Sequence, residues 1–142
     1  MLVTVPLALT LLSGCGSRGS EFIRTCEDAL RYRVADRRTY SRLSSSDRSE
    51  RLTAEAFRSR YRELNRDDYF LSANAMRTRN YRSERWIGTI EYRAGDRNFQ
   101  PKEGAATCEY LVPDKGERSF RRENVHVNGE THARWWVRTR KP

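Results

Sequence analysis

The chain has 142 residues, a net charge of +9 and a mean hydropathy of −0.91. This length fits a single domain, and 11% aromatic residues is more than disordered chains carry, so we expect a small globular domain with a very polar surface. Of the 28 basic residues, 25 are Arg, and we attribute most of them to the codon usage of a GC-rich genome. The charge still predicts attraction to anionic partners.

The N-terminus has the pattern of an export signal. Residues 1–14 contain no charged side chain, and Leu2 to Leu12 is an apolar run that is too short to span a bilayer as a helix. Next comes Leu12-Ser13-Gly14-Cys15, an aliphatic residue, two small residues and a cysteine. This order resembles the lipobox of bacterial lipoproteins.

The resemblance implies a signal peptide at 1–14, a lipidated Cys15 with a flexible tether at 15–21, and a single domain at 22–142. Several acyl chains on one N-terminus make an essentially permanent anchor. Gly16 stands where lipoproteins held at the inner membrane typically have Asp, so it resembles an outer-membrane address. The expected location is the outer membrane, on its periplasmic face or at the cell surface.

Two further cysteines remain once Cys15 is assigned to lipid. Cys26 and Cys108 would then meet in an oxidising compartment, where we expect a structural disulfide that closes a loop of about 80 residues. A redox pair is the alternative, but the spacing is not that of a CxxC motif. The layout "CEDALRYRV", "TYSRL" and "IEYRAGDRNF…ATCEY" also resembles small exported bacterial proteins of unknown function, in which a helix is bridged to an antiparallel sheet. That resemblance implies fold and export but no activity.

The first half of the domain predicts helices. A helix is expected to begin near Thr25 as its N-cap, followed by a short strand or extended segment at Thr39–Leu43 and a loop at Ser44–Arg51. A second helix is expected with Thr53 as its N-cap, and residues 65–83 show no clean period. The apolar positions at helical spacing are Phe22, Cys26, Ala29, Leu30 and Val34 in the first helix, and Phe57, Tyr61 and Leu64 in the second.

From Glu84 onward the pattern changes to the alternation typical of strands. A loop is expected at Gly95–Gly104, and a turn is expected at Pro113–Gly116. The fold class is therefore α+β, with one or two N-terminal helices packed on an antiparallel sheet of about four strands. The expected inward faces are Trp86, Ile90 and Tyr92 on one strand and Ala106, Cys108, Tyr110 and Val112 on the next.

A last hairpin is expected from Ser119–Val127 and Thr131–Thr139 around Asn128-Gly129. A three-residue loop is favoured because it pairs Val127 with Thr131 and gathers the apolar side chains on one face. The outer face would then pair His126 with His132 and Arg122 with Trp136. The apolar face would hold Val125, Val127, Ala133, Trp135 and Val137.

No P-loop, GxGxxG, HExxH or GxSxG motif occurs in the sequence. His126 and His132 lack a third ligand nearby, so we interpret them as hairpin side chains and expect no metal site. Asp67-Asp68 and Ser44–Ser46 are interpreted as surface or loop residues. The sequence therefore predicts no catalytic residues, no cofactor and no enzymatic activity.

Basic and aromatic residues interleave at 31–33, 77–82 and 134–141. Behind a signal peptide, such a surface would face anionic lipid, lipopolysaccharide or an acidic envelope protein, and nucleic acid is not favoured. The expected function is a non-enzymatic cell-envelope lipoprotein with a binding or structural role. The alternative, if residues 1–15 are not a signal peptide, is a cytoplasmic nucleic-acid-binding protein. The candidate contacts to an anionic partner are Arg122, Arg134, Trp136, Arg138 and Arg140.

Overall fold

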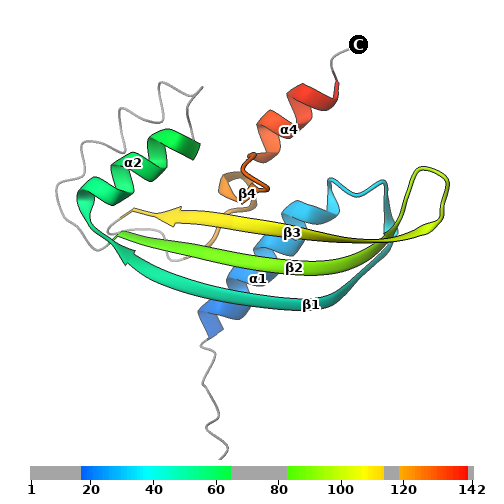
Figure 1. The fold of residues 1–142 in the computed structure, drawn as a ribbon, viewed down its shortest axis with the longest axis horizontal. Coiled ribbons are helices and arrows are strands. Elements are labelled where there is room, and N and C mark those ends of the chain that lie inside the picture. Colours follow the sequence, from blue (N-terminus) through cyan, green and yellow to red (C-terminus); the bar gives the residue numbers. More distant parts are fainter. Residues whose placement is uncertain (1–16, 65–82, 114–118, 141–142) are drawn as a thin grey trace, which may run out of the picture.

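The computed structural model describes residues 17–64, 83–113 and 119–140, which form an antiparallel sheet flanked by helices (Figure 1). Its four strands lie in the order β1-β2-β3-β4, and helix α1 crosses one face of the sheet. This confirms the predicted α+β class. The elements are α1 (Ser17–Arg31), β1 (Asp36–Leu52), α2 (Ala54–Leu64), β2 (Ser83–Gly95), β3 (Pro101–Val112), the 3-10 turn η1 (Arg122–Asn124), β4 (His126–Val127) and α4 (His132–Thr139).

Helix α1 begins earlier than the sequence suggests. It starts at Ser17 rather than near Thr25, so the predicted tether residues 17–21 form its first turns. Thr25 does not cap it, because the Thr25 hydroxyl donates to the Glu21 carbonyl at 2.9 Å, a bond found inside helices. The early start places the predicted stripe residue Phe22 within the helix and adds Ile23 to the side that faces the sheet. The buried positions of that stripe are Phe22, Ile23, Cys26, Ala29 and Leu30.

Strand β1 contradicts the predicted loop at Ser44–Arg51. It pairs antiparallel with β2 from Ser44 opposite Glu91 to Leu52 opposite Ser83. Almost all side chains of β1 are exposed, so no alternation of apolar and polar residues is needed there. Backbone hydrogen bonds to β2 hold β1 as a strand. Its sequence shows no hydrophobic alternation from which a strand could be predicted.

The core lies between α1 and one face of β2 and β3. A Cβ added at Gly88 on β2 would lie 2.9 Å from Phe22 Cε1, which shows how closely α1 approaches the sheet. Phe120 completes the core beside the Phe22 and Trp86 rings, with ring centroids 5.2 and 5.4 Å away. The predicted inward faces are confirmed by the buried side chains Trp86, Ile90, Ala106, Cys108, Tyr110 and Val112, with Tyr92 partly buried against them.

Cys26 and Cys108 form the predicted disulfide. Their Cα atoms are 6.0 Å apart, within the usual range for such bonds, and both side chains are fully buried. The bond ties α1 to the middle of β3 across 82 positions of sequence.

Helix α2 begins as predicted. Thr53 Oγ1 accepts a hydrogen bond from the Ala56 amide at 3.2 Å, which satisfies one of the free donors of the first turn. Phe57 and Leu64 are buried, each 4% exposed. Residues 65–82, where the sequence shows no clean period, and the turn residues 114–118 lie outside the described residues.

The C-terminal segment is not the predicted hairpin. Asn128 and Gly129 do form a turn, but Val127 pairs with Glu130 through amide–carbonyl bonds of 2.9 and 3.1 Å, so the favoured three-residue loop is wrong. Thr131 then acts as an N-cap, since its Oγ1 accepts from the Arg134 amide at 3.4 Å. Residues 132–139 are helical, and only His126–Val127 of the first predicted strand pair with β3.

Candidate functional site

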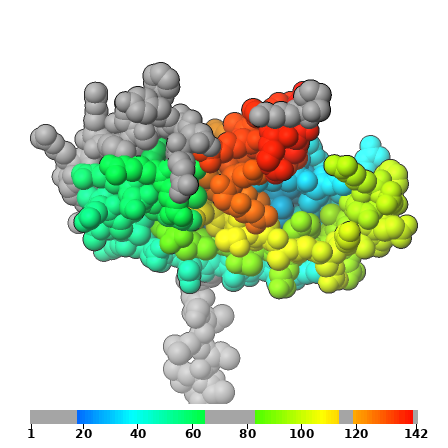
Figure 2. Space-filling view, turned by 45° about the horizontal axis from the view of Figure 1, so that its top comes forward, coloured from blue at the N-terminus to red at the C-terminus, as the bar shows by residue number. Residues whose placement is uncertain are grey.

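The predicted contacts for an anionic partner lie around helix α4, which packs beside α2 on one side of the molecule (Figures 1 and 2). Arg134 joins the two helices through a 3.1 Å bond from its NH1 to the Leu64 carbonyl. Arg138 forms a bidentate ion pair with Glu130, in which its Nε and NH2 donate to the two carboxylate oxygens at 2.8 and 2.9 Å. Two of the five candidates are therefore occupied inside the fold.

The other candidates pair with aromatic rings. Arg140 lies 3.4 Å from the centroid of the Trp136 ring, and Trp136 is 43% exposed, as expected for a surface aromatic. Arg122 stacks on Tyr32 at 4.4 Å rather than on Trp136, so the predicted Arg122–Trp136 pair is wrong. The reason is that α4 replaces the strand that would have placed Trp136 opposite Arg122.

The predicted cross-strand pair of histidines is also wrong. His126 lies on β4 opposite Glu109, whereas His132 lies on α4, with its ring 5.7 Å from that of Tyr32. Burial lowers the pKa of His126 to about 4, with a smaller opposing effect from Glu109. Among residues 17–64, 83–113 and 119–140, no group of three His, Cys, Asp or Glu residues is placed to hold a metal ion.

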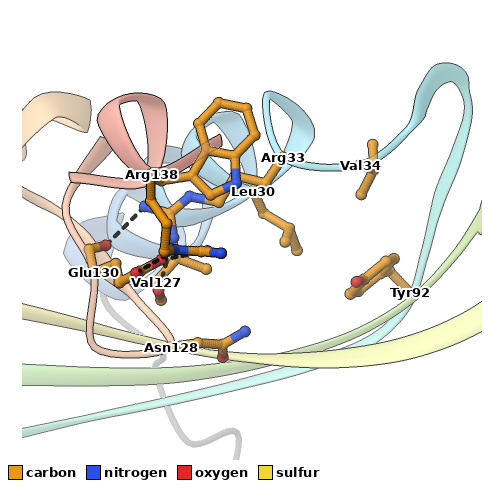
Figure 3. A pocket seen from close by; sticks show the side chains of 9 residues that line it. Leu30, Arg33, Val34, Tyr92, Val127, Asn128, Glu130 and Arg138 are labelled. Atoms are coloured by element: carbon orange, nitrogen blue, oxygen red, sulfur yellow. Dashed lines mark hydrogen bonds and ion pairs between the residues drawn. The ribbon is translucent and has the colours of Figure 1, made fainter. Parts of the chain in front are cut away.

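A pocket of about 440 Å³ lies where the end of α1, β2, the turn after β4 and α4 meet (Figure 3). Arg33 crosses it from the segment after α1. Its NH1 and NH2 donate to the Val127 and Glu130 carbonyls at 2.8 and 2.7 Å. The pocket is lined by Leu30, Arg33, Val34, Tyr92, Val127, Asn128, Glu130, Trp135 and Arg138.

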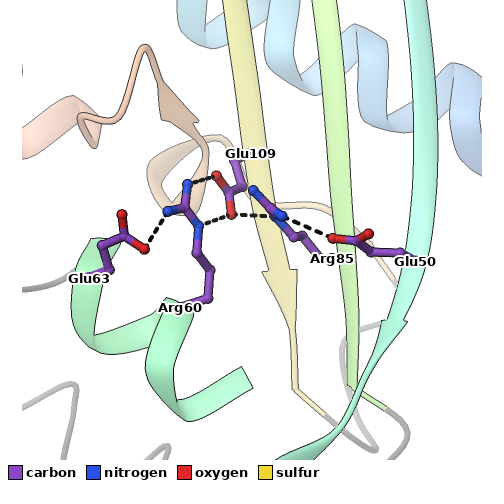
Figure 4. Close-up of polar contacts among 5 residues, drawn as sticks. All are labelled: Glu50, Arg60, Glu63, Arg85 and Glu109. Atoms are coloured by element: carbon purple, nitrogen blue, oxygen red, sulfur yellow. Dashed lines mark hydrogen bonds and ion pairs between the residues drawn. The ribbon is translucent and has the colours of Figure 1, made fainter. Parts of the chain in front are cut away.

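A second polar cluster surrounds Glu109 on the other side of β3 (Figure 4). Its carboxylate is 9% exposed and accepts from Arg60 at 2.7 and 2.5 Å and from Arg85 at 2.8 Å. Burial opposes the charge on Glu109, but these hydrogen bonds outweigh it and leave the pKa below its usual value. Glu63 and Glu50 complete the network, which joins α2, β1, β2 and β3. Every charge in it has a partner, so we assign it a structural role.

The sequence predicts binding residues on a basic surface and gives no signal for the pocket. Arg33 belongs to the basic-aromatic run 31–33, but nothing in that run shows that its side chain reaches the turn 94 positions later. The sequence predicts Asn128 only as a turn residue. The Ser44–Ser46 run lies on β1, where Ser44 Oγ donates to Glu91 Oε2 at 2.6 Å. Cys15, Asp67-Asp68 and the run 77–82 lie outside the described residues.

Comparisons of the chain with protein-family models, with curated proteins and with solved structures find no match. In the described part of the chain, no helix is both long and apolar enough to cross a membrane.

Proposed function

We propose that this protein is an exported bacterial lipoprotein, anchored through Cys15 in the outer membrane, that binds an anionic partner and has no enzymatic activity. The observation that carries the proposal is the Cys26–Cys108 disulfide. It accounts for two of the three cysteines and needs an oxidising compartment to persist. The remaining thiol belongs to the Leu12-Ser13-Gly14-Cys15 lipobox pattern.

The direction of α1 supports a binding role away from the membrane. The helix starts two positions after Cys15 and runs for 15 residues, or about 22 Å. The segment after its far end contacts the turn before α4, through Arg33 bound to the Val127 carbonyl and Tyr32 beside His132. The start of α1 and helix α4 accordingly lie on opposite sides of the sheet region in Figure 1. An anchor at Cys15 would present the α4 region away from its own membrane.

The position of α4 relative to the anchor also favours one of the expected partners over the others. A surface that faces away from the anchoring bilayer suits an acidic envelope component better than the lipid headgroups of that bilayer. Nucleic acid is disfavoured by the disulfide, which would not persist in a reducing cytoplasm.

Metabolic labelling with an alkyne fatty acid tests the anchor. We expect label on the wild-type chain and none on Cys15→Ala. The matched control is the double variant Cys26→Ala/Cys108→Ala, which removes the other two thiols and should still be labelled. Absence of label from the wild type, or label on Cys15→Ala, would contradict the proposal.

A further inference from the structure

We propose that the pocket between α1 and α4 binds a small organic anion, a six-membered ring that carries a carboxylate. Its volume of about 440 Å³ is in the range of small-molecule sites and suits one such ring with its substituents. The inference names a ligand class for the binding role proposed above and rests on that role, although its test does not require the anchor.

Positive charge in the pocket favours an anion. Arg33 is half-buried, and its NH1 and NH2 are held by two backbone carbonyls, which carry no charge to neutralise the guanidinium. Its Nε is buried without a hydrogen-bond partner among the described residues, so one donor remains to be satisfied. The one carboxylate in the lining, Glu130, is already paired with Arg138.

The surroundings of the pocket strengthen that potential. Arg37 and Arg122 lie 4.0 and 4.4 Å from the centroid of the Tyr32 ring, beside His132. The pKa of His132 is lowered by burial and then by Arg122, Arg33 and Arg37. Three guanidinium groups therefore act together on this end of the molecule.

Asn128 supplies a second donor in a fixed orientation. Its φ of 51° places it in the left-handed region that Asn tolerates, within the two-residue turn. The Thr107 amide donates to Asn128 Oδ1 at 3.0 Å, which fixes the side-chain amide. In Figure 3 the nitrogen of that amide points away from the strand and toward the space below Arg33.

Apolar groups form the rest of the wall and suit a ring. Tyr92 lies on the sheet beneath the pocket, held by stacking on Tyr40 at 5.7 Å. Trp135, on α4, also lines the pocket, with the Arg33 guanidinium 6.0 Å from its ring centroid. A carboxylate bound to the Asn128 amide would lie in the field of the Arg33 guanidinium, and its ring would find Tyr92 and Trp135 in the same lining.

The test is an NMR titration of the full chain in its disulfide-bonded form. The probes are D-glucuronate and benzoate, each matched to a neutral ring compound, D-glucose and benzyl alcohol. We expect one or both acids to shift the Asn128 side-chain amide and the Trp135 indole signals, with at least tenfold weaker binding of the neutral match. The acid that binds tells a sugar acid from an aromatic acid. Shifts by neither acid, or equal binding of acid and neutral match, would overturn the proposal.

Asn128→Asp sharpens the test. It keeps Oδ1 for the Thr107 amide and tolerates the same backbone, but it places a negative charge where the donor was. We expect at least a tenfold loss of acid binding. Asn98→Asp makes the same charge change in the exposed turn between β2 and β3. There the backbone amide of Asn98 donates to Asp96 Oδ1, and this control variant should bind the acids as the wild type does. Unchanged binding by Asn128→Asp, or an equal loss in Asn98→Asp, would refute the site. Failure of the fatty-acid labelling would leave this result unaffected, so the two proposals fail separately.

Discussion

Breaking the Cys26–Cys108 disulfide should cost this domain a large part of its stability. The bond joins α1 to β3, and the chain between them contains β1, α2 and β2. With the bond present, the unfolded chain keeps a closed loop and has fewer conformations. With the bond removed, unfolding gains all of that freedom.

The size of the effect follows from the length of the loop. For a separation of 82 positions, the chain-entropy relation gives about 15 cal/mol/K, or about 4.5 kcal/mol at 25 °C. Small domains have total free energies of unfolding of about 5–15 kcal/mol. The reduced domain would therefore lie near the limit of folding, and its folded-to-unfolded ratio would fall about a thousandfold or more.

Urea unfolding followed by circular dichroism measures this difference. Three samples are compared: the oxidised wild type, the reduced wild type and the Cys26→Ala/Cys108→Ala variant. The reduced wild type keeps both buried sulfur atoms, so its loss isolates the cross-link, whereas the variant adds the cost of lost packing. Free energies rather than midpoints must be compared, because a cross-linked unfolded chain exposes less surface and has a lower m value. A reduced wild type within about 1 kcal/mol of the oxidised form would refute the reasoning, since the relation requires about 4.5.

Two further predictions concern buried positions. His126 is 6% exposed, and burial lowers its pKa to about 4, with Glu109 opposing this shift and Arg134 and Arg60 adding to it, whereas the unfolded chain titrates at its usual value of 6.5. The unfolded state then takes up the proton first, so stability is lost as pH falls from 6.5 toward 4, by about 2 kcal/mol between pH 7 and 4.5. His126→Gln should remove that part of the pH dependence, and urea unfolding at both pH values checks it; an unchanged dependence contradicts the burial argument. Gly88→Ala places a Cβ 2.9 Å from the enclosed Phe22 ring and should destabilise the fold by about 1–3 kcal/mol, measured by thermal unfolding. A variant as stable as the wild type would show that α1 can shift away from the sheet.

The parts of the fold that the sequence predicts are those whose apolar side chains share one face. The stripe from Phe22 to Leu30 and the alternation from Ala106 to Val112 are both buried as expected. The pairing of Cys26 with Cys108 is predicted from the assignment of Cys15 to lipid, and both cysteines lie on these two faces in the structure. In each case one face meets the core and the other meets water, so periodicity records the burial directly.

The errors fall where that relation fails. β1 is a strand with almost no buried side chain, so its sequence resembles a polar loop. In residues 131–139 two patterns compete. The alternation of Ala133, Trp135 and Val137 is typical of a strand, whereas Thr131 is a residue type that favours the N-cap of a helix. The structure has the helix, and Thr131 is its N-cap, since it accepts a hydrogen bond from the Arg134 amide. Ala133 and Val137 are then exposed rather than gathered in the core.

The same helix changes how the excess of Arg should be understood. On a predicted strand, Arg134, Arg138 and Arg140 would form one basic face, but in the structure they contact the Leu64 carbonyl, Glu130 and the Trp136 ring. Glu130 neutralises the charge of Arg138, so the three arginines do not form one continuous basic face. Arg33 lines the pocket, where the Val127 and Glu130 carbonyls hold its guanidinium and its Nε has no hydrogen-bond partner among the described residues. A guanidinium that is half-buried in this state gains most from one ligand that brings both an acceptor and a negative charge into the pocket. For the pocket proposed above, the charge that matters is therefore that of Arg33 rather than that of the exposed arginines on α4.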